Sequence, residues 1–179
     1  KTNSGKGTTI DKNITKNIMN QIVKEVGKKE FPRIYLIHGN MKKEEVASLY
    51  AYDKINCFVS ATRGEGYGLP IIDAAASGMP VVATNWSGHL DFLGDKFTKI
   101  NYKLSEIRDE KEDKRIFFKG FRWAEPDKND FKKKIRNVVN DYENKKLSAT
   151  SLQDDVQTNF NSKTIKKLYN KFFKNIIRN

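Results

Sequence analysis

The stretch from Ala61 to Thr84, ATRGEGYGLPIIDAAASGMPVVAT, decides how this chain folds. Three alternating glycines, Gly64, Gly66 and Gly68, precede a short segment of small and apolar residues that has helical character. An apolar run over residues 80–84 follows, and such a run is typical of a strand that is buried on both faces of a parallel sheet. The stretch therefore predicts a turn, a helix and a strand of an α/β fold.

The rest of the chain continues this alternation of strands and helices. Apolar runs predict strands at residues 33–38, 55–60 and 80–84, with weaker signals at 97–104 and 115–118. Helical periodicity predicts helices at residues 9–27, 42–52, 69–77, from Asp127 to about 142, and 162–179. Strands that alternate with helices through short connections predict a Rossmann-like three-layer sandwich with a parallel sheet. We expect residues 1–179 to form a single domain.

The composition indicates a folded chain with a strongly basic surface. The net charge is +12, but 27 of the 34 basic residues are lysine. Specific nucleic-acid recognition favours the planar guanidinium of arginine, so this excess of lysine argues against a nucleic-acid partner. A basic nucleic-acid-binding α/β domain stays the less favoured alternative.

Cysteine and membrane signals are sparse. The single cysteine, Cys57, lies in a predicted strand and excludes an internal disulfide, and we expect a small buried hydrophobe there. No apolar run reaches membrane-spanning length and no signal peptide opens the chain. We find no metal-ligand cluster and expect no bound metal. These observations predict a cytoplasmic protein.

The glycine turn occupies the place where parallel sheets bind ligands. Ligands of such sheets lie beyond the carboxyl ends of the strands, in loops that lead into helices. Glycine allows positive φ and close approach to the backbone, and the free N–H groups at a helix start favour an anion. A pyrophosphate is the natural candidate. Neither the dinucleotide pattern G-x-G-x-x-G nor a Walker loop fits, since the glycines run 64, 66, 68 and the early segment 4–9 lacks the required spacing.

Two carboxylates accompany the glycines. Glu65 lies inside the turn and Asp73 follows eight residues later, in the predicted helix. Carboxylates bind sugar hydroxyls through strong, directional hydrogen bonds, so this arrangement suits a nucleotide sugar. Asp73 could instead only complement the helix dipole. Arg63 could pair with a phosphate or with surface carboxylates, and His89 could contact substrate or make a turn hydrogen bond.

At these residues the chain resembles a known family. The segments RGEGYGLP, AASGMPVVAT and NWSGHLDFL, which begin at Arg63, Ala75 and Asn85, resemble the E-x7-E region of the retaining glycosyltransferases of family 4. That region belongs to the carboxyl-terminal, donor-binding half of the GT-B fold. The likeness extends more loosely from Ile10 to the end of the chain, and it includes a turn expected from Trp123 to Asp127.

The resemblance implies a role for each matching residue. Glu65 would be the catalytic-site carboxylate that contacts the donor hexose, and Asp73 would bind ribose in place of the family's second glutamate, with a side chain one methylene shorter. The donor would also contact the residues of the turn and of two other segments, namely Arg63, Gly66, Tyr67, Gly68, Leu69, Lys6, Gly39 and Asn40. Which cation neutralises the pyrophosphate stays open between Lys1 and Lys6.

The resemblance also implies a larger enzyme. The full protein would transfer a hexose from a nucleoside-diphosphate sugar, with retention, to a glycan or lipid-linked acceptor. An amino-terminal GT-B domain would supply the acceptor pocket, and no cofactor would be needed. We expect the chain by itself to bind donor weakly and to turn over little or nothing. The alternative is a non-catalytic glycosyltransferase-like binding module.

The terminal helix is strongly basic on one side and apolar on the other. No acidic residue follows Asp155, while six lysines and arginines occupy residues 163–178. A basic amphipathic helix can lie on an anionic membrane, which would place the protein at the cytoplasmic face. We favour packing of its apolar face on the protein body or on the amino-terminal domain, and the two roles are compatible.

Overall fold

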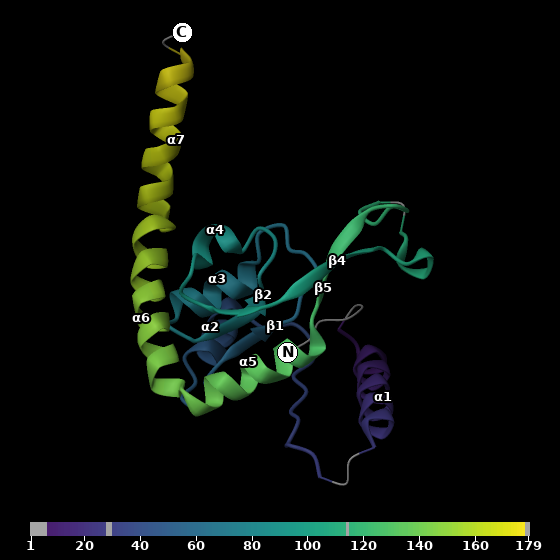
Figure 1. Ribbon diagram of the computed structural model, residues 1–179. Helices are drawn as coiled ribbons and strands as arrows, with labels where there is room; N and C mark the ends of the chain where they lie inside the picture. Colours follow the sequence, from purple (N-terminus) through teal and green to yellow (C-terminus); the bar gives the residue numbers. More distant parts are fainter. Residues whose placement is uncertain (1–6, 28–29, 114, 178–179) are drawn as a thin grey trace. The chain divides into compact units, whose positions relative to one another are not determined.

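The computed structural model describes residues 7–27, 30–113 and 115–177 (Figure 1). Contacts divide the chain into two compact units, residues 1–47 and 48–179. The first unit contains helix α1 (Thr9–Val26) and most of helix α2 (Lys43–Tyr50). The second unit contains the sheets and the remaining helices.

Helix α1 forms where the sequence predicts it. The side-chain oxygen of Thr8 accepts from the N–H of Asp11, the carboxylate of Asp11 accepts from the N–H of Thr8, and Gly27 ends the helix at φ +64°. Residues 33–38, by contrast, do not form the predicted strand. A strand exists only through hydrogen bonds to a neighbour, and Ile34 and Tyr35 are exposed instead of packed between two layers.

A parallel sheet lies at the centre of the second unit. Its strands are β1 (Phe58–Ser60), β2 (Val81–Thr84) and β3 (Thr98–Ile100), in the spatial order β1-β2-β3. β2 is buried along its whole length, as its mostly apolar sequence predicts. The predicted strands at residues 55–60 and 80–84 are therefore confirmed, the first of them in shortened form.

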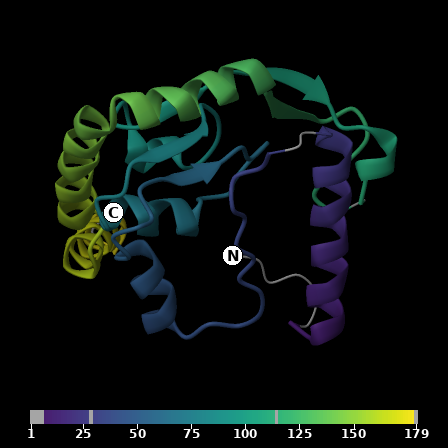
Figure 2. The ribbon, with the colours of Figure 1, turned by 90° about the horizontal axis from the view of Figure 1, so that it is seen from below.

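Helices cover both faces of this sheet (Figure 2). Val81 and Ala83 pack on one side with helices α3 (Leu69–Ala76), α4 (Leu90–Leu93) and α6 (Tyr142–Asn159). Val82 points to the other side and packs with Ile100 and Val138 of helix α5 (Lys128–Asn140). Because side chains alternate along a strand, one strand serves two cores. The predicted three-layer sandwich has this arrangement.

An antiparallel hairpin extends the second unit. It consists of β4 (Tyr102–Glu106) and β5 (Arg122–Pro126), and a short 3-10 helix, η1 (Asp109–Lys111), lies in the segment between them (Figure 1). The predicted strand at 97–104 is thus two strands in different sheets. Asn101 separates them, and its N–H and C=O bond to Asp130 and to the N–H of Asp127, so these bonds fix the point at which the chain leaves the parallel sheet.

Two further predictions near this hairpin are wrong. Residues 115–118 are not a strand, because the N–H groups of residues 115–117 bond to the carboxylate of Asp113 instead of to a neighbouring chain. The actual strand, β5, occupies the segment that was interpreted as a turn. Its partner β4 lies about twenty residues away in sequence, so no local signal in residues 122–126 indicates this pairing.

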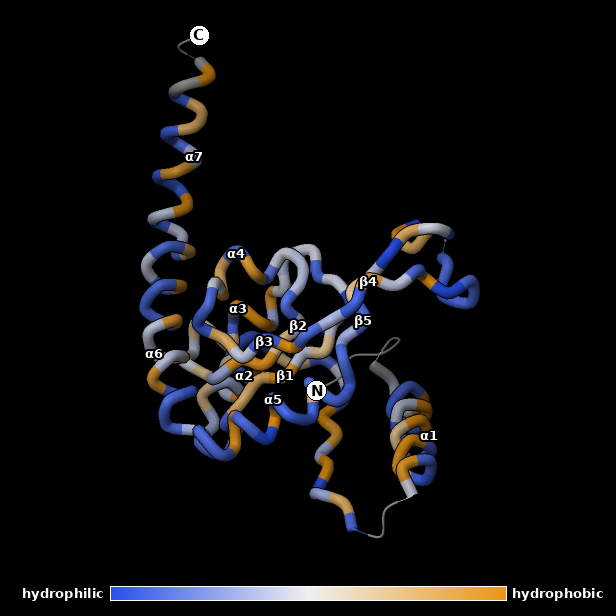
Figure 3. Tube along the Cα trace, viewed as in Figure 1, coloured by the Kyte–Doolittle hydropathy of each residue, from blue (hydrophilic) through white to orange (hydrophobic). Residues whose placement is uncertain are grey.

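The sequence analysis also missed helix α6. Its apolar residues are widely spaced among small and polar ones, so its periodicity is weak. Ala149, Leu152 and Val156 are nevertheless buried, and Leu152 and Val156 belong to the core with α3. Helix α7 (Ser162–Ile177) follows, with alternating apolar and basic segments along the tube (Figure 3). No helix among the described residues combines the length and apolarity that a membrane crossing requires.

The contact between α6 and α3 predicts a clear stability effect. Leu152 is 1% exposed, so Leu152→Ala should lower the free energy of unfolding by about 2–5 kcal/mol through lost burial and a residual cavity. Leu147, on the same helix, is 69% exposed, and Leu147→Ala should change it by less than about 0.5 kcal/mol. Urea denaturation of both variants measures the difference. Equal effects would contradict the placement of α6.

The thiol of Cys57 offers a second test of the core. Burial raises the pKa of this thiol to about 11, so little nucleophilic thiolate forms near pH 8. We expect iodoacetamide to alkylate the native chain much more slowly than the urea-unfolded chain at pH 8. Mass spectrometry of quenched samples measures both rates. Comparable rates would show that Cys57 is accessible and reactive, contrary to a structural role.

Candidate functional site

The glycine turn lies at the carboxyl edge of the parallel sheet. It joins the end of β1, at Ser60, to the start of α3, at Leu69. The segment that leaves β2, from Asn85 to His89, emerges at the same edge, because parallel strands share their carboxyl ends. Two loops from neighbouring strands thus meet where open α/β sheets bind their ligands.

Gly68 is required by the fold itself. Its φ is +90°, and a Cβ there would lie 3.2 Å from a side-chain carbon of Ile71 and 3.3 Å from Cβ of His89. The prediction that glycine permits positive φ is correct here. His89 is fully buried beneath this point, and its Nε2 donates to the carbonyl oxygen of Thr84 at 2.7 Å. His89 therefore makes the internal hydrogen bond rather than facing the turn's surface.

At Gly64 and Gly66, no contact within the fold requires glycine. Neither adopts positive φ, and a Cβ on either would meet nothing within 4 Å. The expectation of positive φ is thus wrong at these two positions. Their missing side chains instead leave open space directly over the backbone, which allows another molecule to approach it closely.

Four successive backbone N–H groups lead from this turn into helix α3. Within the described part of the chain, no acceptor bonds to the N–H of Gly66, Tyr67, Gly68 or Leu69. Pro70, in the first turn of the helix, has no N–H to satisfy. Unpaired N–H groups and the positive end of the helix dipole together attract an anion.

Ser87 holds the glycine turn from the side of β2. Its hydroxyl accepts from the N–H of Glu65 at 2.9 Å and donates to the carbonyl oxygen of Glu65 at 2.5 Å. Ser87 has φ +92°, the one positive φ among the described residues other than glycine. A strained backbone at a site residue indicates that surrounding structure maintains the geometry. Both peptide groups that flank the Glu65 Cα are therefore fixed.

The next residue makes the closest backbone approach in the site. A Cβ on Gly88 would lie 2.1 Å from the carbonyl oxygen of Gly66, and the N–H of Gly88 donates to the carbonyl oxygen of Glu65 at 3.3 Å. No side chain fits between these two loops. The contact between Gly88 and the turn sets the position of the turn over the sheet.

The two carboxylates of the site line different pockets. Glu65, with Gly64 and Gly66, lines a pocket of about 730 Å³. Asp73, with Tyr67 and Leu69, lines a second pocket of about 720 Å³. Neither carboxylate accepts a hydrogen bond from a described residue. Gly66 lines the first pocket and Tyr67 and Leu69 line the second, so the run of four unpaired N–H groups extends from one pocket to the other.

The environment of Asp73 is defined by Tyr50. The hydroxyl of Tyr50 donates to the carbonyl oxygen of Pro70 at 3.1 Å. Burial, and then the negative charge of Asp73, raise the pKa of Tyr50. The Asp73 carboxylate is exposed and close enough to influence that hydroxyl, so it is available to an external hydrogen-bond donor.

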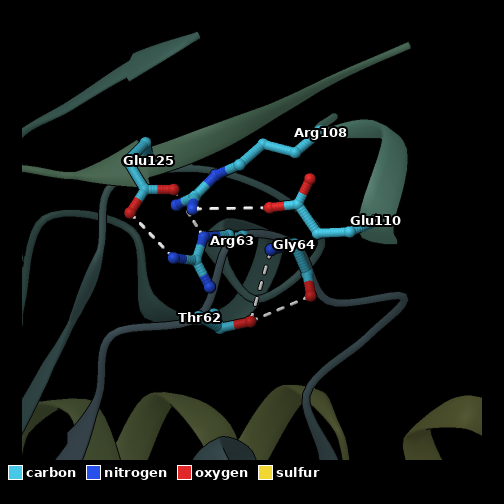
Figure 4. A network of polar contacts seen from close by, with 6 residues as sticks. All are labelled: Thr62, Arg63, Gly64, Arg108, Glu110 and Glu125. Carbon is cyan, nitrogen blue, oxygen red and sulfur yellow. Dashed lines mark hydrogen bonds and ion pairs between the residues drawn. The ribbon is translucent and has the colours of Figure 1, made fainter. Parts of the chain in front are cut away.

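Arg63 has a partner within the protein. Its guanidinium donates to both carboxylate oxygens of Glu125, at 2.5 and 2.8 Å (Figure 4). It also lies 4.7 Å from the ring centroid of Trp123. The hydrogen bond from Arg63 lowers the pKa of Glu125. Of the two partners that the sequence left open for Arg63, the structure places it on a carboxylate.

The other predicted site residues lie elsewhere. Gly39, with φ +103°, and Asn40 belong to the first unit, so their role stays a prediction. Lys6 and Lys1 lie outside the described residues. Across residues 7–27, 30–113 and 115–177, no group of three or more His, Cys, Asp or Glu side chains is placed to hold a metal ion.

Sequence reasoning missed two residues that shape the site. Ser87 precedes a glycine, and Ser-Gly pairs mark turns, but nothing local shows that its hydroxyl bonds 22 residues away. Glu125 lies 62 residues from Arg63. Both pairings depend on which strands are neighbours in the sheets.

The two hydrogen bonds of Ser87 can be separated from its backbone strain. Ser87→Ala removes both bonds and keeps the strain, so it should lower the free energy of unfolding by about 1–3 kcal/mol. Ser87→Gly removes the same bonds but relieves the positive φ, by roughly 1 kcal/mol, and should be the milder change. Urea denaturation of both variants measures the order. If Ser87→Gly were the more destabilising variant, the inferred strain would be absent.

Comparison with known proteins identifies the family and the fold of the chain. A model of family 4 glycosyltransferases in conflict systems matches residues 42–167. No curated protein matches the chain. A solved structure of sucrose-phosphate synthase from Thermosynechococcus elongatus is similar, with a TM-score of 0.65 and 17% sequence identity. The match covers 92% of this chain and 35% of that chain, so this chain spans about a third of its length.

The similarity to the solved structure concerns the fold, and the family model shows the family to which the chain belongs. The predicted Rossmann-like α/β sandwich of the GT-B type is confirmed. The family model covers well over half of the chain and includes the glycine turn, both carboxylates and helix α6. The chain belongs to the family 4 glycosyltransferases of conflict systems.

Proposed function

We propose that this chain is the donor-binding half of a retaining glycosyltransferase that uses a nucleoside-diphosphate sugar. The observation that carries the proposal is the run of four unpaired N–H groups, from Gly66 to Leu69, beside the unpartnered carboxylate of Glu65. A diphosphate is an anion that such a run can bind. A hexose supplies hydroxyl donors for the carboxylate.

We infer the orientation of the bound donor from the two pockets. Ribose binds at Asp73, the diphosphate binds the N–H groups at the start of α3, and the hexose enters the pocket of Glu65. Arg63 is engaged by Glu125, so in this unit the backbone N–H groups and the helix dipole carry most of the diphosphate stabilisation.

Transfer itself needs a second substrate. The bond between the anomeric carbon and the diphosphate oxygen breaks, a bond to an acceptor hydroxyl oxygen forms with retention, and the hydroxyl proton is released. Preorganised N–H donors stabilise the charge that develops on the departing diphosphate. The acceptor is a glycan or a lipid-linked saccharide, and an amino-terminal GT-B domain completes the cleft. The isolated chain binds donor weakly and transfers little.

The open space at Gly66 provides the sharpest test. Since a Cβ there meets nothing within 4 Å, Gly66→Ala should leave the melting temperature unchanged. The added methyl group would occupy the space of the bound diphosphate, so binding of the preferred nucleotide should weaken about tenfold, or by about 1.4 kcal/mol. Calorimetric titration of the chain with UDP, GDP and ADP measures this, and Asp73→Ala should weaken binding similarly.

Asp154→Ala is the matched control, because Asp154 is an exposed acid of helix α6 that lines neither pocket. It should bind like the unmodified chain. If none of the three nucleotides binds, or if Gly66→Ala binds as well as the unmodified chain, the proposed donor site is wrong.

A further inference from the structure

Helix α7 has an apolar face that is exposed. Every side chain of the helix from Lys166 to Lys174 is exposed. The apolar ones among them, and one beyond, recur at intervals of three and four residues and so share one side of the helix: Leu168, Tyr169, Phe172, Phe173 and Ile176, each exposed by 53–61%. Large apolar side chains that gather on one exposed face indicate an interaction surface.

Three aromatic rings make this face continuous. The rings of Tyr169 and Phe173 are stacked, with their centroids 6.3 Å apart. The rings of Phe172 and Phe173 meet edge to face at 5.6 Å. Apolar segments therefore follow one another along the outer part of the helix (Figure 3).

The remaining sides of α7 are basic. Residues 162–177 contain no aspartate or glutamate and five lysines, namely Lys163, Lys166, Lys167, Lys171 and Lys174. Lysines at intervals of four, such as Lys163, Lys167 and Lys171, repel one another along a helix. The first turn also lacks an acidic residue, although one would stabilise the helix there. These charges weaken the isolated helix, and an anionic surface beside it would turn the repulsion into attraction.

The start of α7 is fixed to the end of α6. The side-chain amide of Asn161 donates to the carbonyl oxygens of Gln157 and Thr158, at 2.8 and 2.9 Å, and its oxygen accepts from the N–H of Thr164 at 2.9 Å. The hydroxyl of Thr164 donates to the carbonyl oxygen of Thr158 at 2.8 Å. The helix α7 therefore continues from α6 (Figure 1) with its exposed face held ready by the fold.

An anionic lipid surface matches both sides of this helix. We propose that α7 lies in the surface of an anionic bilayer, with its apolar face at the boundary between headgroups and acyl chains and its lysines toward the lipid phosphates. Helices that lie in a membrane surface combine aromatic and aliphatic residues on one face with lysines on the other. The long lysine side chains can extend along the helix to reach the headgroups. The proposal goes beyond donor binding and does not depend on it.

Other occupants engage only part of the helix. A second copy of α7 would bring two sets of lysines together, and like charges repel. A nucleic acid would bind the lysines through its phosphates but would leave the aromatic face exposed. Protein interfaces are depleted in lysine, whereas α7 has five in sixteen residues. A lipid surface engages the apolar face and the charges together.

Flotation with lipid vesicles tests the proposal on the full chain. We expect the chain to float with vesicles of equimolar phosphatidylglycerol and phosphatidylcholine, and to bind them about tenfold or more tightly than vesicles of phosphatidylcholine alone. Added sodium chloride should weaken the binding, because it screens the attraction between lysines and headgroups.

The aromatic face is tested by the double variant Phe172→Ala/Phe173→Ala, which should bind anionic vesicles about tenfold more weakly. The matched control is Phe118→Ala/Phe121→Ala. Phe118 and Phe121 are exposed as well, and their ring centroids are also 5.6 Å apart, but they lie between β4 and β5. This control should bind like the unmodified chain. All four residues are exposed, so thermal melts should show that both variants fold.

The charges are tested by the double variant Lys166→Glu/Lys171→Glu. Each of these lysines lies three residues from an apolar residue, Tyr169 or Leu168, so both border the apolar face. Binding to anionic vesicles should weaken about tenfold or more. Lys132→Glu/Lys133→Glu changes the net charge equally at exposed positions of α5 and should weaken the binding much less.

Several results would overturn the proposal. These are no binding to anionic vesicles, equal binding to both kinds of vesicle, or equal losses in a variant of α7 and its control. Binding of a DNA duplex without binding of anionic vesicles would also contradict it. Asp73→Ala should bind anionic vesicles within about twofold of the unmodified chain, so failure of the donor site and failure of the membrane surface are distinguishable.

Discussion

The burial of strand β2 on both faces is the constraint on which the second unit depends. Val81 and Ala83 enter the core with α3, α4 and α6, while Val82 enters the core with α5. A strand without a solvent-exposed face carries mostly apolar side chains, here all but Thr84, and it fixes its neighbours on either side through its hydrogen bonds. The loops that leave β1 and β2 are consequently brought to one edge of the sheet.

At that edge, close contacts between backbone atoms hold the two loops in position. Gly88 lies so close to the carbonyl oxygen of Gly66 that no Cβ fits, and Ser87 bonds both peptide groups around Glu65 at the cost of a strained φ. Strain of this kind persists where surrounding structure enforces it, which is common at binding sites. The turn is held in one geometry before any ligand arrives, so little ordering cost remains for binding.

The hairpin of β4 and β5 is connected to this site. Arg63 belongs to the turn, yet its side chain holds Glu125 and Trp123 of the hairpin. The unpaired N–H groups, the carboxylate of Glu65 and the side chain of Trp123 are therefore parts of one connected assembly. The ion pair of Arg63 with Glu125 and its contact with Trp123 connect the hairpin to the turn.

Local signals predicted much of the secondary structure. The capping box and Gly27 delimit α1, Asp127 caps α5, and the apolar run of β2 identifies the central strand. Helix α6 was missed because its buried residues are few and widely spaced, so its helical periodicity is weak. Strand β5 was missed because a strand of an isolated hairpin is defined by its partner. No local property of residues 122–126 indicates that they pair with residues 102–106.

The sequence by itself determined the main elements of the site: a glycine turn with a carboxylate between a strand and the start of a helix, and a family resemblance that the comparison confirmed. Only the tertiary structure decided which of these groups are free to contact another molecule. In the structure, Arg63 is paired with Glu125 and His89 is buried. Glu65 and Asp73 line separate pockets. The physical reason is that propensity and capping act over a few residues, whereas these pairings join loops 22 to 62 residues apart through the order and register of strands.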